Sequence, residues 1–199
     1  MTAHSHGHET SAAVSNRVKQ VVATLERRGF VTEAALDRIV EKFLMNATPA
    51  NGRRLVARAW VDPDFKKRLV QDGSAAVEEL GIDMSHWAPV KLVAVENTPS
   101  QHNVIVCTLC SCYPIALLGP SPAWYKSEAY RSRVVRDPRG TLADFGFDLP
   151  EKIDVRVWDS TADTRYMVVP LRPPGTAGLN EEQLAALVTR NGLIGTAPV

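Results

Sequence analysis

The chain has few cysteines and no long hydrophobic run. Its three cysteines allow at most one disulfide and leave one thiol over, so a disulfide framework is excluded. No apolar stretch approaches the ~20 residues that a membrane-spanning helix needs, and the segment MTAHSHGHETSAAVSNR lacks the apolar core of a secretory signal. We therefore expect a cytoplasmic protein without membrane contact. In that compartment cysteines stay reduced and more often bind metals or carry out chemistry.

The chain also lacks a dominant charge. It carries 23 basic and 22 acidic residues, a formal net charge of +1. Broad electrostatic capture of nucleic acid is therefore not indicated. The composition, 45% hydrophobic and 23% charged, is that of an ordinary globular protein, and the length fits one domain with or without an extension.

The hydrophobic pattern divides the chain into three parts. Residues 1–12 are small and polar and are predicted to be a disordered tail; the alternating His4, His6 and His8 could bind a metal only weakly. Residues 13–81 carry apolar residues at helical spacing and are predicted to form a helical N-terminal region. Residues 82–199 are predicted to form an α+β domain.

The predicted α+β domain contains β-branched runs of strand length. They cover residues 90–96, 103–107, 154–159 and 165–170. The last two follow each other across a short turn, which suggests an antiparallel pair. Helices are predicted over residues 122–137 and 180–190, the second capped by Asn180, and Gly81 is predicted to end the helical region.

All three cysteines lie in VCTLCSCYP, residues 106–114, at the end of a predicted strand, where functional loops commonly emerge. Three interpretations are open. A redox pair of Cys107 and Cys110 would leave Cys112 unused, and such pairs usually open a helix in a βαβ unit. A zinc or iron–sulfur site normally needs four ligands in two separated pairs, and the chain has no second cysteine pair.

The third interpretation is a metal held by thiolates and backbone amides. One residue separates Cys110 from Cys112, so a tight turn would bring the amide nitrogens of Ser111 and Cys112 into a plane with both sulfurs. Cys107 would add a third sulfur and leave one position open for substrate or water, as a catalytic metal requires. This donor set suits a soft transition metal better than magnesium or calcium.

The loop VCTLCSCYP resembles the metal-binding loop of the nitrile hydratase α subunit. Thr108 and Tyr113 match the cobalt-type loop, whereas iron-type members usually carry Ser and Thr there. The resemblance covers about residues 10–196 and includes ARAWVDPDFKKRLVQDG, LGPSPAWYKSEAYRSRVVRDPRG and VWDSTADTRYMVVPLRPPGTAGLNEEQLAALVTR. It implies a helical N-terminal arm followed by a layered α/β/β/α domain that carries the metal loop at a strand end.

The resemblance also implies hydration of a nitrile to the amide at a low-spin, non-corrin Co(III) centre, with Fe(III) as the alternative. The metal ligands would be Cys107, Cys110, Ser111 and Cys112. Cys110 would be oxidised to sulfinate and Cys112 to sulfenate, and both would take part in catalysis. Relatives draw arginines for the oxidised sulfurs from a β subunit. We therefore expect an αβ complex or a dimer of αβ, loaded with cobalt by a metallochaperone or activator.

Four further residues are assigned by the resemblance. Asp159 and Arg165 match residues that orient the metal loop from outside the ligand set; otherwise they would be an ordinary surface pair at a turn. Ile115 stands where relatives have an aromatic ring beside the substrate, and Trp124 either lines the same pocket or packs in the core. The smaller Ile115 favours a bulkier nitrile, for example a nucleoside nitrile such as toyocamycin.

Two other functions could use the same cysteines. Thiocyanate hydrolase γ-type subunits share the loop, but their anionic substrate would favour extra basic residues, and no arginine follows directly after Tyr113 and Pro114. A non-catalytic metal-binding or redox-sensing subunit is the alternative outside the enzymes. The segment IDMSHWAPVK also departs from the family pattern, which makes simple aliphatic nitriles a less safe choice of substrate.

Overall fold

The structure is a computed structural model that describes residues 6–84, 90–109 and 112–199. The chain divides into two compact units, residues 1–45 and residues 46–199. The helices between residues 46 and 81 fall in the second unit, together with the strands. The expected division after residue 81, between a helical region and an α+β domain, stays a prediction. Within the described residues, no helix combines the length and apolar character needed to cross a bilayer.

The first unit consists of α1 (His6–Arg27) and most of α2 (Glu33–Asn46). The helix α1 begins inside the segment expected to be a tail, and Ala12 and Ala13 within it are helix-favouring residues. Neither α2 nor the preceding turn buries an apolar side chain. The large apolar side chains that stay exposed in this unit are Val14, Val18, Val21, Phe30, Ile39, Val40, Phe43, Leu44 and Met45.

The second unit is built on two pairs of parallel strands. β1 (Lys91–Glu96) pairs with β4 (Thr164–Val169), and β2 (Gln101–Val106) pairs with β3 (Asp154–Asp159). The expected antiparallel pairing of β3 with β4 is wrong, because the short turn between them carries the chain from one pair to the other. Parallel pairing requires long crossovers, which the helix-containing segments after β1 and β2 provide.

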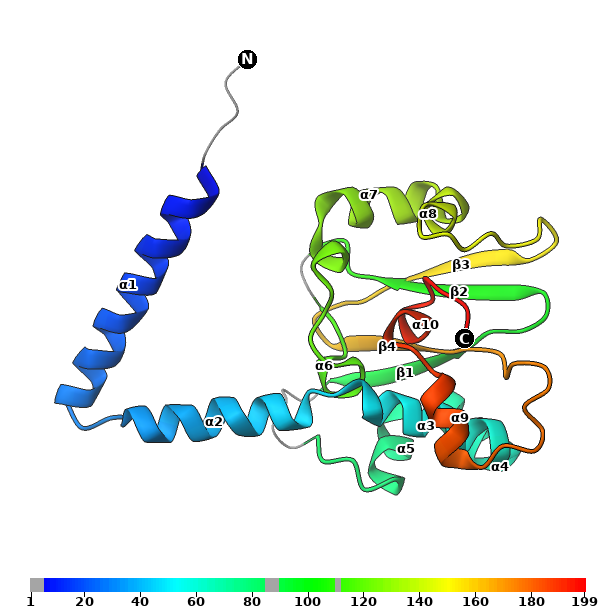
Figure 1. The fold of residues 1–199 in the computed structure, drawn as a ribbon, viewed down its shortest axis with the longest axis horizontal. Helices are drawn as coiled ribbons and strands as arrows, with labels where there is room; N and C mark the ends of the chain where they lie inside the picture. Colours follow the sequence, from blue (N-terminus) through cyan, green and yellow to red (C-terminus); the bar gives the residue numbers. More distant parts are fainter. Residues whose placement is uncertain (1–5, 85–89, 110–111) are drawn as a thin grey trace, which may run out of the picture. The chain divides into compact units, whose positions relative to one another are not determined.

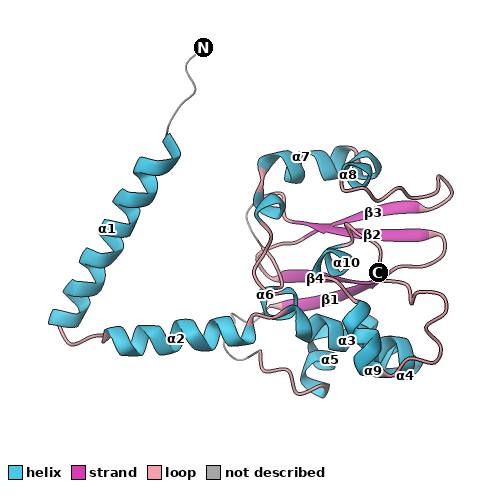
Figure 2. Ribbon diagram, in the orientation of Figure 1, coloured by secondary structure: helices cyan, strands magenta, loops and turns pink. Residues whose placement is uncertain are grey.

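Helices cover the outer faces of both strand pairs (Figures 1 and 2). On the β1–β4 side lie α3 (Pro49–Val61), α4 (Pro63–Gln71), α5 (Gly73–Glu79) and α9 (Glu181–Leu187). On the β2–β3 side lie α7 (Glu128–Arg136) and α8 (Pro138–Asp144). The short helix α10 (Arg190–Ile194) contacts both β2 and β4. The expected helical N-terminal region followed by a mixed α and β domain is confirmed.

Capping side chains decide where these helices begin. Thr48, Asp62 and Asp137 each cap a helix whose first residue is a proline, a position where the missing N–H has no cost. The helix expected over residues 122–137 is broken at Ser127, which separates the 3₁₀ turn η1 (Ala123–Lys126) from α7 and caps α7. Asn180 caps α9 as predicted, in a reciprocal capping box with Gln183.

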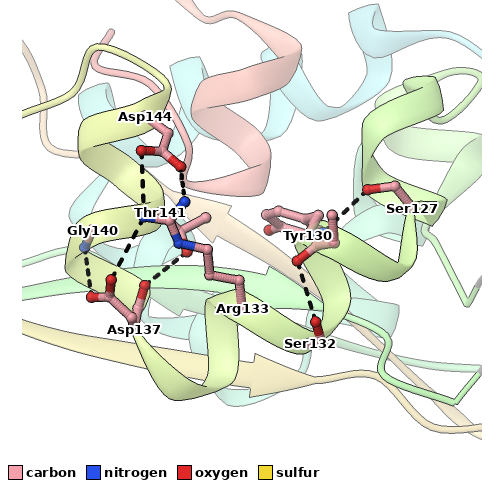
Figure 3. Close-up of polar contacts among 9 residues, drawn as sticks. Ser127, Tyr130, Ser132, Arg133, Asp137, Gly140, Thr141 and Asp144 are labelled. Atoms are coloured by element: carbon pink, nitrogen blue, oxygen red, sulfur yellow. Dashed lines mark hydrogen bonds and ion pairs between the residues drawn. The ribbon is translucent and has the colours of Figure 1, made fainter.

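The joint between α7 and α8 is held by side chains that Figure 3 shows in close-up. Ser127 Oγ accepts from the Tyr130 N–H at 3.2 Å, and Asp137 Oδ1 accepts from the Gly140 N–H at 2.8 Å. Arg133 on α7 pairs with Asp144 at the end of α8. These contacts join α7 to α8, and Arg131, also on α7, reaches the cysteine loop.

Candidate metal centre

The cysteine loop leaves the end of β2, as predicted. Val106 is the last residue of the strand, and Cys107 after it has an exposed fraction of 0%. Leu109, two residues on, is 92% exposed, and Cys112 is partly buried. Cys110 and Ser111, two of the expected ligands, lie outside the described residues.

Asp159 holds Thr108, the residue after Cys107 in the cysteine loop. In the parallel register of β2 and β3, Val106 lies opposite Asp159, so the carboxylate reaches the edge where the loop begins. The Thr108 N–H donates to Asp159 Oδ1 at 2.9 Å, and the Thr108 hydroxyl donates to Asp159 Oδ2 at 2.5 Å. Asp159 thus contacts the loop by two hydrogen bonds to one residue, Thr108.

Two further side chains touch the loop. Arg131 Nη1, from α7, donates to the Thr108 carbonyl at 3.3 Å. The Tyr125 hydroxyl, from η1, donates to the Cys112 carbonyl at 3.3 Å. The sequence did not assign these contacts, because each partner lies more than ten residues from the loop and no spacing pattern connects them.

An aromatic cluster lies beneath the loop. The Tyr125 ring meets Tyr113 edge-on at 4.8 Å between centroids, and Trp124 meets Tyr130 at 4.9 Å and Phe145 at 4.7 Å. Burial raises the pKa of Tyr125 and of Tyr130 far above the ordinary value for a phenol, so both hydroxyls remain hydrogen-bond donors. Its contacts with Tyr130 and Phe145 place Trp124 within this cluster.

A pocket of about 170 Å³ opens beside the loop. Its lining consists of Met84, Val90, Leu92, Tyr113, Pro114, Ile115, Ala116, Leu117 and Arg165. Ile115, an expected pocket residue, is in this lining, whereas Trp124, the other expected pocket residue, is not. The pocket wall is mainly apolar, with Arg165 as its cationic member.

Arg165 organises the turn between β3 and β4. Its Nη1 donates to the carbonyls of Ala162 and Thr164, both at 3.2 Å, and to that of Thr161. Arg165 follows the first residue of β4, and Asp159 ends β3, so the turn brings both to the edge where the cysteine loop emerges. The structure therefore gathers Cys107, Asp159, Arg165 and Ile115 at one edge of the strands.

The described part of the loop fits a soft metal. No three His, Cys, Asp or Glu side chains converge within the described residues, and positions 110 and 111 fall outside them. The thiols of Cys107 and Cys112 stand on either side of those two positions. Thiolates are the donors that soft transition metals select, so the chemistry of this donor set agrees with such a metal.

Sequence comparison matches nearly the whole chain to one protein family. Residues 12–197 match the family described as nitrile hydratase, alpha chain. The high-molecular weight cobalt-containing nitrile hydratase subunit alpha of Rhodococcus rhodochrous is 48% identical over 184 residues, covering 91% of this chain and 89% of that protein. The thiocyanate hydrolase subunit gamma of Thiobacillus thioparus is 44% identical over 169 residues, covering 80% of this chain and 70% of that protein.

Comparison with solved structures also matches the fold of this chain to that family. A solved structure of a double mutant of the Fe-type nitrile hydratase from Comamonas testosteroni Ni1 superposes with a TM-score of 0.87 at 47% identity. It covers 94% of this chain and 90% of that one. The extent of these matches shows that the chain belongs to the nitrile hydratase α chain family, a family of enzymes.

Proposed function

We propose that this chain is the metal-binding α subunit of a nitrile hydratase, which adds water to R–C≡N to form the amide R–C(=O)NH₂. The observation that carries the proposal is the position of the cysteine loop. It leaves a buried strand end at Cys107, is held by Asp159 at Thr108, and opens beside an apolar pocket that contains Ile115. Such a site offers both a reactive centre and a place for the organic part of a nitrile.

The metal is proposed to be Co(III), with Fe(III) as the alternative. Its ligands would be the sulfurs of Cys107, Cys110 and Cys112 and the backbone nitrogens of Ser111 and Cys112, with Cys110 as sulfinate and Cys112 as sulfenate. Relatives named as cobalt-containing support cobalt, and the Fe-type structural neighbour keeps iron as the alternative. When bound, the metal supplies Lewis-acid chemistry, which polarises a nitrile or activates water.

The chain's own residues would position the cysteine loop and exclude bulk water from the pocket. Asp159 holds the Thr108 end of the loop, and Arg165 fixes the neighbouring turn through its carbonyls. The apolar wall formed by Leu92, Ile115 and their neighbours would take the R group and keep bulk water away from it. Trp124 would act indirectly, by packing in the aromatic cluster under the loop.

A neutral nitrile suits this pocket better than thiocyanate. Its lining is mainly apolar, and the Nη1 of Arg165 already donates to three backbone carbonyls of the β3–β4 turn. An anion entering the pocket would have to compete with those carbonyls. Because Ile115 is smaller than the aromatic ring expected there, a bulky nitrile such as a nucleoside nitrile is the proposed substrate class.

The working enzyme is proposed to be a complex with a β subunit, as αβ or a dimer of αβ, loaded with cobalt by an activator protein. The relatives are named as subunits, which supports a partner chain. A β subunit would cover the exposed Leu109 and supply cations for the oxidised sulfurs.

The test is co-expression of this chain with its β partner in cobalt medium, followed by metal analysis and hydration assays. We expect about one cobalt per α chain, amide formation from a nucleoside nitrile, and about three added oxygens on the peptide that carries Cys110 and Cys112. Cys112→Ala should lose both metal and activity. Faster conversion of thiocyanate than of any nitrile would assign the chain to the other enzyme, and full cobalt without turnover would contradict the catalytic role.

A further inference from the structure

The two ends of the cysteine loop are each held by a side chain from the segment of residues 123–136. At the first end, Arg131 Nη1 donates to the Thr108 carbonyl at 3.3 Å. At the second end, the Tyr125 hydroxyl donates to the Cys112 carbonyl at 3.3 Å. Both contacts join this segment to backbone oxygens, so they act on the path of the loop and not on a ligand atom.

Tyr125 is a rigid anchor. Its exposed fraction is 1%, and its ring is packed against Tyr113 at 4.8 Å, Tyr130 at 5.8 Å and Trp124 at 6.1 Å. A buried phenol in such a cluster has one orientation, so its hydroxyl offers a fixed donor.

Holding the Cys112 carbonyl constrains Cys112 itself. The peptide that follows Cys112 is planar, so fixing its carbonyl oxygen fixes the plane that joins Cys112 to Tyr113. Tyr113 is buried in the same aromatic cluster. The peptide plane is therefore held at the Cys112 carbonyl by Tyr125 and at its other end by the buried Tyr113. The direction of the Cys112 side chain and amide then depends on the remaining dihedrals of one residue.

Arg131 contacts the other end of the loop from a helix. It lies in α7, whose start is capped by Ser127 (Figure 3). At Thr108 it acts opposite Asp159: the carboxylate takes the N–H and hydroxyl, and the guanidinium takes the carbonyl. All three polar backbone and side-chain groups of Thr108 are thus engaged.

We infer that Tyr125 and Arg131 are positioning residues that set the separation and orientation of the loop ends, so that the ligand set is arranged before the metal arrives. The inference rests on the proposed function in so far as it takes the loop to be a metal site. A loop arranged in advance loses less conformational freedom on metal binding and holds the metal more tightly.

The chain offers a matched control for each residue. Tyr130 belongs to the same cluster, is also buried, and donates its hydroxyl to the Ile105 carbonyl of β2 at 2.8 Å, so Tyr130→Phe removes a comparable bond that does not reach the loop. Arg133 lies two residues after Arg131 on α7 but pairs with Asp144, so Arg133→Gln removes a guanidinium that does not reach the loop.

The experiment uses the complex with the β subunit, loaded with cobalt. For Tyr125→Phe and Arg131→Gln we expect cobalt to be lost to a chelator about tenfold faster than from the wild type, the effect of one hydrogen bond. We also expect a shifted sulfur-to-metal charge-transfer band and a lower kcat with little change in KM. Tyr130→Phe and Arg133→Gln should keep the wild-type band and cobalt retention, even where their thermal unfolding midpoints fall.

Equal cobalt retention and identical bands in each variant and its control would overturn the inference. If Tyr125→Phe fails to fold, the pair Arg131→Gln and Arg133→Gln decides by the same measurements. If the wild-type complex hydrates no nitrile, the proposed function fails, but the cobalt retention and the absorption band still test the positioning role.

Discussion

The two edges of the strand layers differ in how their polar groups are used. At the loop edge, where β2 and β3 end, the exposed Asp159 bonds to the partly buried Thr108 beside the cysteine loop. At the far edge, where β1 ends and β2 begins, Asn97, His102 and Asn103 are buried with exposed fractions of 6% or less. These three form a closed hydrogen-bonded network.

The polar groups of the far-edge network are paired with one another and with neighbouring groups. The Asn103 amide donates to the Glu96 carbonyl at 2.8 Å and to Asn97 Oδ1 at 3.1 Å, and its oxygen accepts from Trp158 Nε1 at 2.9 Å. His102 bonds Asn97 through Nδ1 and the Gly195 carbonyl through Nε2. Buried and mutually satisfied groups stabilise a fold, whereas exposed groups held in place remain available for chemistry.

The largest expected effect on stability lies at the far edge. Asn103→Ala removes the side-chain partner of the part-buried Trp158 N–H and of the Glu96 carbonyl, and leaves Asn97 Oδ1 with only the Asn103 backbone N–H. We expect the free energy of unfolding to fall by about 3 kcal/mol. Turnover per bound cobalt should be unchanged. Chemical denaturation and metal-normalised kinetics measure the two quantities, and a stable variant with impaired turnover would contradict the division between the edges.

At the loop edge we expect the opposite result, a loss of function with little loss of stability. Asp159→Ala removes two hydrogen bonds to Thr108 from an exposed position, so unfolding should change by less than about 1 kcal/mol. Turnover or cobalt retention should fall by about 10- to 100-fold, as is usual for residues that orient metal ligands. Asp154→Ala, an exposed carboxylate at the opposite end of β3, is the matched control and should leave both properties unchanged.

The loop edge was predictable from sequence and the far edge was not, for physical reasons. The cysteine motif is local, and a strand ending at Val106 could be read from its β-branched residues. Strand pairing is not local: β3 and β4 adjoin in sequence, yet each pairs with a strand about fifty or seventy residues away, because helices must cover both pairs. Nothing in the spacing of Tyr125 or Arg131 connects them to the loop.

The far edge should also respond to pH through His102. Burial lowers the pKa of His102, although the hydrogen bond to the Gly195 carbonyl acts in the opposite direction. The unfolded chain therefore binds a proton more readily than the folded chain, and stability that is complete above the ordinary pKa of 6.5 is lost as the pH falls below it. The slope from this residue is at most about 1.4 kcal/mol per pH unit.

Protonation would place a second donor at His102 Nδ1, facing the Asn97 amide nitrogen at 3.1 Å. Urea denaturation between about pH 5 and pH 8, the interval in which histidines ordinarily titrate, compares the wild type with His102→Gln. The variant should be less stable at neutral pH but should show a flatter pH dependence. Parallel curves would mean that another group causes the decline.

The smallest effect is expected from an ion pair at the far edge that is not buried. Lys66 Nζ lies 2.7 Å from Glu96 Oε1, and the two side chains are 36% and 34% exposed. Solvent screens such a pair, so Glu96→Gln should cost less than about 1 kcal/mol of unfolding free energy, and added salt should reduce the difference. The Glu96 backbone carbonyl, only a few bonds away, accepts from buried Asn103 and contributes to the much larger loss expected for Asn103→Ala. A loss in Glu96→Gln as large as that in Asn103→Ala would mean that location at the far edge, and not burial of satisfied polar groups, accounts for the stability of this part of the fold.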